Sequence, residues 1–504
     1  MPLTPSQELA AATRGRCVLV SAAAGSGKTR VLVERLMRYI DAGEDIDRFL
    51  VITFTRAAAA ELRSRILREL NERIAADPAN RRLRRQTELI ARADIGTIDS
   101  ICGRLLREYV HLTALPPDFR IIEEERAAEL RSAALTRVLE ARYEALETDP
   151  AFRALSDSVG AGRDDSRLEK LVLSLCASLR SHSDPEDWME RCRAALDVSG
   201  LSDAAETPWG RYLLDRCAER ADFWAQRLRA ACRLMAAEGH EKLYAAYAGG
   251  FSEAADALET LSRCAERSWD EARKALPIPL KIKGFRGDDP LKERLVALWS
   301  NCREECKELG TELYESSAEL LEDLNRVRPS LEALLSLARD AEAAFAADKR
   351  RAGVVDFSDQ EHMILQLLER EDAVRAELSE RWREVMVDEY QDTNPSQNDL
   401  VLLLGAKRKN VCVVGDDDQS IYSFRGAAIG NILDFDKSFP NAKIIKLEQN
   451  YRSTSHILDA ANTVISNNMG RHAKKLWTAG DEGEKLHLTL CQTSDLNKDL
   501  FSSF

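Results

Sequence analysis

The sequence has no run of apolar residues long enough to cross a membrane, and its first residues lack the pattern of a signal peptide. It has no zinc-type Cys-x-x-Cys pair, although it contains 11 cysteines, of which Cys302 and Cys306 are the two closest. Scattered cysteines of this kind are typical of reduced, buried thiols in a cytoplasmic protein. Internal repeats and low-complexity segments are also lacking. We therefore expect a cytoplasmic globular protein without membrane contact.

The charge balance argues against a broad basic surface. Lys and Arg number 72 against 85 Asp and Glu, which gives a net charge of −13. Local clustering of basic residues, rather than the total, decides nucleic-acid binding, so any DNA contact has to be made by specific grooves. With 504 residues, 44% of them hydrophobic, the chain can fill roughly three or four domains, each with a sizeable core.

A short apolar stretch near the start of the chain leads into a phosphate-binding loop. Its end, Gly-Lys-Thr, fits the P-loop pattern, with Ala22 where the first Gly usually stands. Gly25 and Gly27 let backbone N–H groups turn toward phosphate oxygens. Lys28 brings a charge to the β- and γ-phosphates, and Thr29 offers a hydroxyl to Mg²⁺. A Gly-rich turn without a ligand is the alternative, and a strand before and a helix after favour the nucleotide. The loop comprises Ala22, Ala23, Ala24, Gly25, Ser26, Gly27, Lys28 and Thr29.

The first part of the chain alternates apolar and helical stretches. Apolar runs at residues 17–21, 49–54 and 94–98 predict a parallel sheet with crossover helices. Ahead of them, the amide of Gln7 can donate and accept at once, which suits an adenine edge, although a solvated residue at a helix start is the commoner role. Phe54 ends the second run, where α/β proteins place ligands, and can stack on a base or fill the core.

Strand signals disappear between residues 107 and 347, where Ala/Leu/Glu/Arg-rich segments predict an all-helical insertion without catalytic residues. The expected helices cover residues 123–143, 168–179, 210–236, 251–274 and 291–347. Strands return at residues 384–389, 409–416 and 442–447. The α/β domain is therefore interrupted by the helical region and then completed.

The first strand after the insertion ends in two acids, Asp388 and Glu389. A phosphate loop needs an acid for Mg²⁺ and a base for the attacking water. We expect Asp388 to hold the metal and Glu389 to orient and deprotonate the water. Adjacent acids after a strand are common, so this assignment depends on the motifs that follow.

Three stretches resemble the motifs of one helicase family. Residues 388–397 resemble motif II, residues 414–427 motif III and residues 447–454 motif IV of the UvrD/Rep-type superfamily 1 DNA helicases. The resemblance implies an α/β fold in which a RecA-like P-loop domain with a parallel sheet carries a large helical insertion. A second RecA-like domain would follow. The implied domains are 1–110 and 348–440 for the first motor domain, 111–347 for the insertion and 441–504 for the start of the second.

The resemblance also implies roles for single residues. Gln7 corresponds to the family residue that reads adenine, and Arg30 lies in the phosphate shell. Gln419 corresponds to the motif III glutamine that links the γ-phosphate to the DNA contacts. Tyr451 would stack on adenine, and Arg452, supplied by the opposing lobe, would reach the γ-phosphate and stabilise charge in the transition state.

The implied DNA contacts are mainly aromatic. Phe54, Tyr422 and Phe424 carry rings that can stack on unpaired bases of any sequence, with Arg425 on the DNA backbone. Two positions depart from the family pattern. Asp99 stands where relatives often have a His, and its carboxylate would repel phosphate. Phe424 stands where close relatives commonly have Trp, but it keeps a stacking face.

The resemblance implies an ATP-dependent 3′-to-5′ DNA helicase that uses ATP and Mg²⁺. It would act on single-stranded DNA and single/double-strand junctions in repair or recombination, with a protein partner. One alternative is the helicase portion of an AddA/RecB-like helicase–nuclease, which the long insertion and residues 105–109 resemble. Another is an ATP- and DNA-binding module without motor activity. Motifs V and VI have no counterpart in these 504 residues. We therefore expect this chain to bind ATP·Mg²⁺, to hydrolyse it slowly and not to unwind duplexes.

Overall fold

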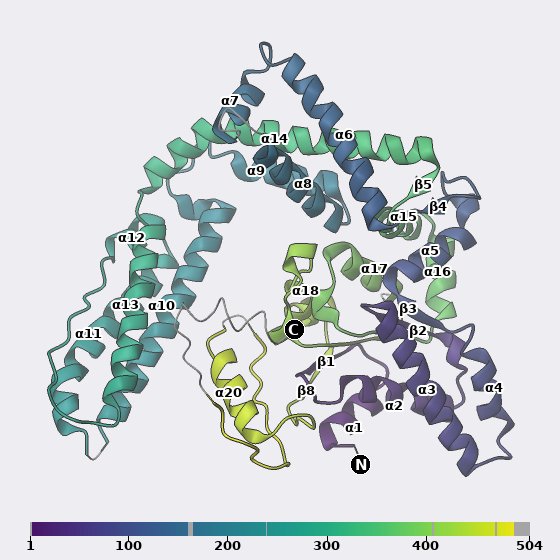
Figure 1. The fold of residues 1–504 in the computed structure, drawn as a ribbon, viewed down its shortest axis with the longest axis horizontal. Helices are drawn as coiled ribbons and strands as arrows, with labels where there is room; N and C mark the ends of the chain where they lie inside the picture. The colour runs from purple at the N-terminus through teal and green to yellow at the C-terminus, as the bar shows by residue number, and fades with distance from the viewer. Residues whose placement is uncertain (1–2, 160–164, 238, 406–407, 469–470, 488–504) are drawn as a thin grey trace, which may run out of the picture. The chain divides into compact units, whose positions relative to one another are not determined.

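The chain forms two compact units, seen in a computed structural model (Figure 1). The first comprises residues 1–137, 174–183 and 341–504, and the second comprises 138–173 and 184–340. Within them, the structure describes residues 3–159, 165–237, 239–405, 408–468 and 471–487. The sequence predicts an insertion at 111–347, and the outer parts of that range group with the first unit.

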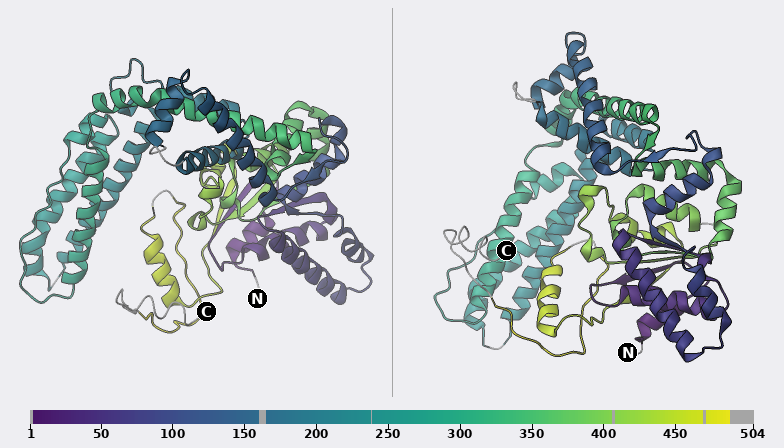
Figure 2. Two further views of the ribbon diagram at one scale, coloured as in Figure 1. Left: turned by 45° about the horizontal axis from the view of Figure 1, so that its top comes forward. Right: turned by 45° about the vertical axis from the view of Figure 1, so that its right-hand side comes forward.

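A six-stranded parallel sheet lies at the centre of the first unit, in the order β3-β2-β6-β7-β1-β8. Its strands are β1 (Val18–Ala22), β2 (Phe49–Thr53), β3 (Asp94–Thr97), β6 (Glu384–Val387), β7 (Val411–Gly415) and β8 (Lys443–Leu447). Figure 2 shows purple and green strands together in this sheet although the insertion separates them in the sequence. The predicted fold class, a parallel-sheet domain with a helical insertion, is confirmed.

Helices cover both faces of the sheet because its strands are apolar on both sides, as a buried parallel sheet requires. In β1, Val18 and Val20 pack into the core of one face and Leu19 into the core of the other. The first face carries α1 (Pro5–Ala12), α2 (Lys28–Asp41), α3 (Arg56–Ala76) and α4 (Arg81–Leu89). The second carries α5 (Ile98–Glu108), α15 (Phe357–Arg370), α16 (Asp372–Arg381), α17 (Pro395–Gly405), α18 (Gly430–Leu433) and α19 (Phe435–Ser438).

A small second sheet pairs β4 (Arg120–Ile121) with β5 (Val354–Val355), one before and one after the second unit in the sequence. The prediction of an all-helical insertion was wrong at β4, because two residues are too few to show an alternating pattern. All ten cysteines in the described part of the chain are free thiols. Within that part, no helix has the length and apolarity needed to cross a membrane.

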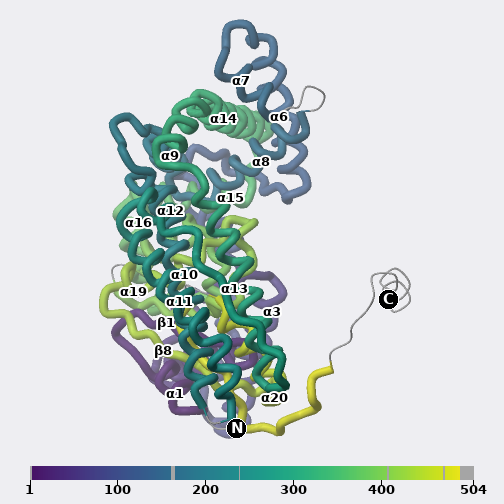
Figure 3. Tube along the Cα trace, turned by 90° about the vertical axis from the view of Figure 1, so that its left-hand side faces the viewer, coloured from purple at the N-terminus to yellow at the C-terminus, as the bar shows by residue number. Residues whose placement is uncertain are grey.

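The second unit is built from helices, with α6, α8 and α14 extending into the residues of the first. The helices are α6 (Glu124–Glu144), α7 (Pro150–Val159), α8 (Ser166–Ser181), α9 (Pro185–Leu196), α10 (Pro208–Met235), α11 (Glu241–Ala265), α12 (Trp269–Lys274), α13 (Lys292–Glu312) and α14 (Ser317–Ala352). In Figure 3, α10, α11 and α13 run side by side. Between α11 and α13, Phe251 stacks on Trp299 with ring centroids 4.8 Å apart. The predicted helices 251–274 and 291–347 are each divided in two. Ser268, for example, caps the N-terminus of α12 and so begins a new helix.

The strand β8 belongs to the first sheet. The sequence predicts that a second motor domain begins at residue 441, whereas β8 lies parallel to β1 with Val18 opposite Lys443 and Ala22 opposite Leu447. Residues 449–453 then lead to α20 (Ser455–Ile465). Arg452 therefore follows a strand of the sheet that carries the phosphate loop. Its expected supply by an opposing lobe stays a prediction. A strand's own residues do not determine which sheet it joins.

Candidate functional site

The loop between β1 and α2 is shaped by two glycines. Gly25 and Gly27 have φ angles of 70° and 88°, in the left-handed region that favours glycine. A Cβ on Gly27 would lie 2.9 Å from the Gln7 amide nitrogen, and one on Gly25 would lie 2.7 Å from that of Asn450. A larger residue at either position would therefore be strained. Lys28 begins α2, so the first-turn N–H groups of this helix face the loop, as at phosphate sites.

Lys28 contacts one of the predicted acids. Its Nζ lies 2.5 Å from Oε2 of Glu389, across the ends of β1 and β6. Glu389 has a left-handed backbone (φ 52°), which is uncommon for a residue with a side chain and costs about 1–3 kcal/mol. Asp388 precedes it, and its backbone N–H is held 2.9 Å from the carbonyl of Ile52 in β2. The sheet thus brings the phosphate loop and the two acids together.

The carboxyl groups near Lys28 repel one another. Burial and the charge of Glu389 raise the pKa of Asp388 to about 6, although Lys28 acts in the opposite direction. Burial and Glu389 likewise raise the pKa of Asp392 to about 6. This excess of acid over base suits a bound cation. The Asp388 carboxylate and the Thr29 hydroxyl are the hard oxygen ligands that Mg²⁺ prefers.

Gln7 is buried against the phosphate loop. Its Nε2 donates to the Ser26 carbonyl at 2.8 Å, and its Oε1 accepts from the backbone N–H of Thr4 at 3.1 Å. The amide thereby fixes the start of α1 to the loop. Its predicted contact with adenine stays a prediction.

Asn450 is a site residue that the sequence reasoning missed. Its Nδ2 donates to the Ala24 carbonyl at 2.6 Å, and its Oδ1 accepts from the backbone N–H of Arg452 at 2.8 Å. The backbone N–H of Tyr451 donates to the Gly25 carbonyl at 2.9 Å. Motif IV therefore lies directly on the phosphate loop. The available signal was the position of Asn450 immediately before Tyr451.

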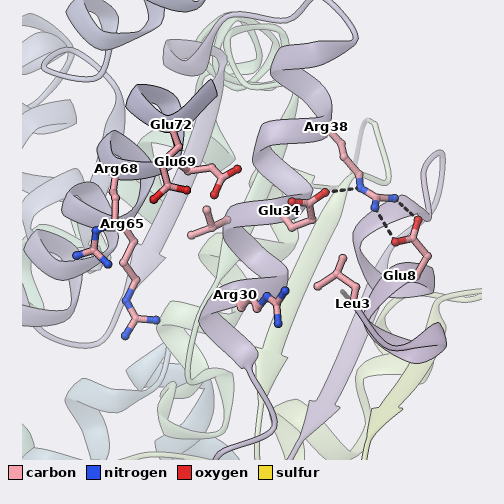
Figure 4. Close-up of a pocket in the computed structure, with 10 residues that line it drawn as sticks. Leu3, Glu8, Arg30, Glu34, Arg38, Arg65, Arg68, Glu69 and Glu72 are labelled. Atoms are coloured by element: carbon pink, nitrogen blue, oxygen red, sulfur yellow. Dashed lines mark hydrogen bonds and ion pairs between the residues drawn. The ribbon is translucent and has the colours of Figure 1, made fainter. Parts of the chain in front are cut away.

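A polar pocket of about 640 Å³ lies beside Arg30, between α1, α2 and α3 (Figure 4). Its volume is within the range of small-molecule sites. On its α1 side, Arg38 is paired with Glu8 at 2.6 Å and with Glu34 at 2.9 Å. The lining residues are Leu3, Glu8, Arg30, Val33, Glu34, Arg38, Arg65, Arg68, Glu69 and Glu72. Arg30 is the third residue of α2, so the pocket lies beside the first turn of that helix.

Gln419 is joined to the acids by hydrogen bonds. Its Nε2 donates to the carboxylate of Asp416, at the end of β7. The backbone N–H of Asp416 donates to Oε1 of Gln391 at 2.9 Å, and Gln391 Nε2 donates to Glu389 at 3.0 Å. The structure therefore joins Gln419 to Glu389 and Lys28 through Gln391, which the sequence reasoning did not single out.

The predicted DNA-contact residues form one aromatic row. The ring centroids of Phe54 and Tyr422 are 5.2 Å apart, and those of Tyr422 and Phe424 are 6.0 Å apart. The Arg425 guanidinium lies 5.4 Å from the Tyr422 ring and 5.5 Å from the Phe424 ring. Phe424 is 74% exposed, so its ring is open to a stacking partner.

Asp99 stands in the first turn of α5. Burial raises the pKa of its carboxyl group, although the charge of Arg56 acts in the opposite direction. Its predicted repulsion of DNA phosphate stays a prediction.

Comparison with known proteins gives two family matches and a set of relatives. The family model of the UvrD/REP helicase N-terminal domain matches residues 3–440, and that of the UvrD-like helicase C-terminal domain matches residues 445–501. An ATP-dependent helicase/nuclease subunit from Geobacillus kaustophilus is 34% identical over 494 residues, which are 93% of this chain and 39% of the relative. The protein of the same name from Desulforudis audaxviator is 36% identical over 497 residues, covering 92% and 39%. The one from Bacillus cytotoxicus is 32% identical over 523 residues, covering 99% and 42%. This chain thus spans about two fifths of the length of these relatives.

Proposed function

The chain belongs to the UvrD/REP helicase family, and on this premise we propose that it is the helicase portion of an ATP-dependent DNA helicase–nuclease. The relatives that align with more than nine tenths of this chain are named as helicase/nuclease subunits. Their names favour this reading over a helicase without a nuclease. Since those names describe one component of a larger enzyme, they also support a protein partner. We propose that the enzyme to which this helicase portion belongs also has the nuclease function that the names of the relatives give.

The contact between Lys28 and Glu389 is the observation that carries the proposal. In the proposed mechanism, Lys28 binds the β- and γ-phosphates of ATP. The Thr29 hydroxyl and the Asp388 carboxylate would hold Mg²⁺. Glu389, released from Lys28 by the phosphates, orients and deprotonates the attacking water. Mg²⁺ held by these two residues would neutralise phosphate charge during hydrolysis.

Base recognition and γ-phosphate contact come from the residues around the loop. We assign the adenine to Gln7 and Tyr451, and the phosphates to Arg30 and Arg452. The hydrogen bonds of Asn450 to the loop support this assignment, because they hold the backbone of Tyr451 and Arg452 against Gly25.

Single-stranded DNA binds along the aromatic row. Stacking on Phe54, Tyr422 and Phe424 requires unpaired bases, which favours single strands and single/double-strand junctions over duplex. Gln419 lies at the start of the loop that carries two of these rings and is hydrogen-bonded toward Glu389. Nucleotide and DNA binding are therefore coupled in the proposal.

The coupling can be measured on the unmodified chain. A labelled oligo(dT) is titrated with and without a non-hydrolysable ATP analogue and Mg²⁺. We expect the dissociation constant to change by about fivefold or more, the lower range of measured couplings between sites. Equal dissociation constants would contradict the proposal, as would equal affinity for an oligo(dT) and a blunt duplex. The nuclease part is tested by reading the gene on both sides of the 504 codons.

A further inference from the structure

A lysine that the nucleotide and DNA sites do not use is buried at the ends of β1 and β7. The side chain of Lys474 is only 1% exposed. Its Nζ donates to Asp416 and to Asp417, each at 2.6 Å, and lies 3.4 Å from the Ser21 hydroxyl. Asp418 lies 3.6 Å away and is also paired with Arg471 at 2.7 Å. One ammonium group therefore contacts two different strand ends.

These contacts place Lys474 between the phosphate loop and residues 416–425, the segment that carries Tyr422 and Phe424. Ser21 lies in β1, just before the phosphate loop, and its hydroxyl donates to Asp417 at 3.2 Å. Asp416 accepts from Lys474 with one carboxylate oxygen and from Gln419 with the other. Lys474 therefore holds the Asp416 carboxylate, and this carboxylate positions the side chain of Gln419.

The segment that carries Lys474 also lies along motif IV. The Lys446 ammonium donates to the Ala473 carbonyl at 2.5 Å. The backbone N–H of Trp477 donates to the Glu448 carbonyl at 3.1 Å, and the backbone N–H of Asn450 donates to the Trp477 carbonyl at 2.8 Å. Residues 473–477 therefore hold residues 446–450, which lead directly into Tyr451 and Arg452.

The charge of Lys474 is maintained by its partners. Burial alone would lower the pKa of the ammonium, but the carboxylates of Asp416 and Asp417 outweigh it and raise the pKa. Buried ion pairs contribute little net stability, because desolvation cancels most of the attraction. Their best-attested use is to fix one arrangement of the chain among alternatives.

We propose that Lys474 is a positioning residue that couples nucleotide binding to single-stranded DNA binding. It does so by holding the strand before the phosphate loop, the Asp416 carboxylate that positions Gln419, and the segment beside motif IV. The inference rests on the proposed function, since coupling requires both ligands. Lys474 contacts neither ligand in it.

The test compares two lysines that are neighbours in the sequence. Lys474→Met removes the ammonium and keeps a side chain of similar length. Lys475→Met makes the same change at an exposed side chain and serves as the matched control. Oligo(dT) is titrated into each variant with and without a non-hydrolysable ATP analogue and Mg²⁺.

We expect Lys474→Met to bind each ligand alone within about threefold of the unmodified chain, because the phosphate loop and the rings keep their side chains. The ratio of the DNA dissociation constants measured without and with the ATP analogue is about five or more in the unmodified chain, and we expect it to fall to about one in Lys474→Met. Lys475→Met keeps the ratio, and Lys474→Arg restores part of it because the charge returns. A ratio in Lys474→Met equal to that of the unmodified chain overturns the inference. A ratio of one in the unmodified chain overturns the proposed function, and the coupling role with it.

Lys474→Met leaves Asp416 and Asp417 buried without a counter-ion, so folding is checked by circular dichroism. The variant Lys474→Met with Asp417→Asn removes one of these charges and replaces the single variant if that one unfolds. Hydrogen exchange on the unmodified chain needs no substitution. We expect the ATP analogue to slow hydrogen exchange both in residues 416–425 and in residues 471–477. An exchange rate at 471–477 that is the same with and without the analogue overturns the inference.

Discussion

Lys28 and Glu389 form an ion pair, with Nζ 2.5 Å from Oε2, across the ends of two strands separated in the sheet by β7. In the proposed function, the lysine that binds phosphate is therefore already paired with the base. We expect phosphate oxygens to displace this carboxylate, so that the ion pair opposes nucleotide binding and Glu389, once displaced, can act on water.

The first prediction concerns Glu389→Gln. The amide cannot form the ion pair and removes a negative charge near the phosphates, so we expect nucleotide affinity to rise by a few-fold, about 1 kcal/mol or less. It also cannot accept a proton, so any hydrolysis by the chain should be lost. Fluorescent-nucleotide titration and phosphate release measure the two effects. Parallel loss of binding and hydrolysis would argue against the water-activating role.

The second prediction concerns the exposed ring of Phe424. Phe424→Leu keeps an apolar side chain but removes the flat face, and it should weaken oligo(dT) binding by about 5- to 150-fold, the equivalent of one stacked base. Phe424→Trp restores a ring and should bind at least as tightly as the unmodified chain. Fluorescence anisotropy at fixed salt measures both. Equal affinities for the two variants would show that stacking is not the contact.

The third prediction concerns pH and Glu361, which is buried in α15. Burial, followed by the charge of Asp99, raises the pKa of Glu361 to about 7, against Gln397 and Asn394, which donate to its carboxylate. Because the folded pKa lies above the ordinary value of 4.5, the folded chain binds the extra proton. This contribution to stability is complete below about pH 4.5 and is lost as the pH rises through about 7.

Glu361→Gln should therefore remove a fall in the free energy of unfolding between about pH 5 and pH 8, of up to about 3 kcal/mol. Urea unfolding at both pH values measures it. Glu369→Gln changes an exposed acid of the same helix and should leave the pH dependence unchanged. An unchanged pH dependence in Glu361→Gln would mean that this carboxyl group titrates normally.

The fourth prediction concerns the buried pair of Arg35 and Glu384, which joins the phosphate-loop helix α2 to β6. Arg35 Nε donates to Glu384 at 2.7 Å, and both side chains are almost fully buried. Arg35→Met leaves Glu384 without its guanidinium and should cost about 3–5 kcal/mol of unfolding free energy, most of which Glu384→Gln recovers in the double variant. Arg38→Met, on the same helix but in an exposed pair with Glu8, should cost about 1 kcal/mol or less. Equal costs for the two arginines in urea unfolding would contradict this account.

The parallel sheet and the family could be predicted because their signals are local. The phosphate loop has a fixed spacing of Gly25, Gly27 and Lys28, and the strand before Asp388 is a continuous apolar run. Both patterns depend only on neighbouring residues. The family and the fold class are confirmed, whereas the roles of the single site residues stay predictions.

Contacts between distant segments could not be predicted in the same way. A lysine such as Lys474 is usually solvated, and its burial depends on acids about 57 residues earlier in the chain. Gln391 accepts from the backbone N–H of Asp416, and Asn450 donates to the carbonyl of Ala24. Both contacts join residues that are far apart in the sequence, so local patterns do not reveal them. For the same reason the placement of β8 in the first sheet appeared only in the structure.

The nucleotide affinity of Lys28→Ala tests the central claim most directly, which is that the loop between β1 and α2 holds the phosphates of ATP. Equilibrium dialysis against ATP and Mg²⁺ compares it with the unmodified chain and with Lys409→Ala, a lysine before β7. We predict one nucleotide per unmodified chain and per Lys409→Ala chain. We predict a loss of about 10- to 150-fold in affinity for Lys28→Ala, the equivalent of one charged hydrogen bond. An affinity that Lys28→Ala leaves unchanged would contradict the account.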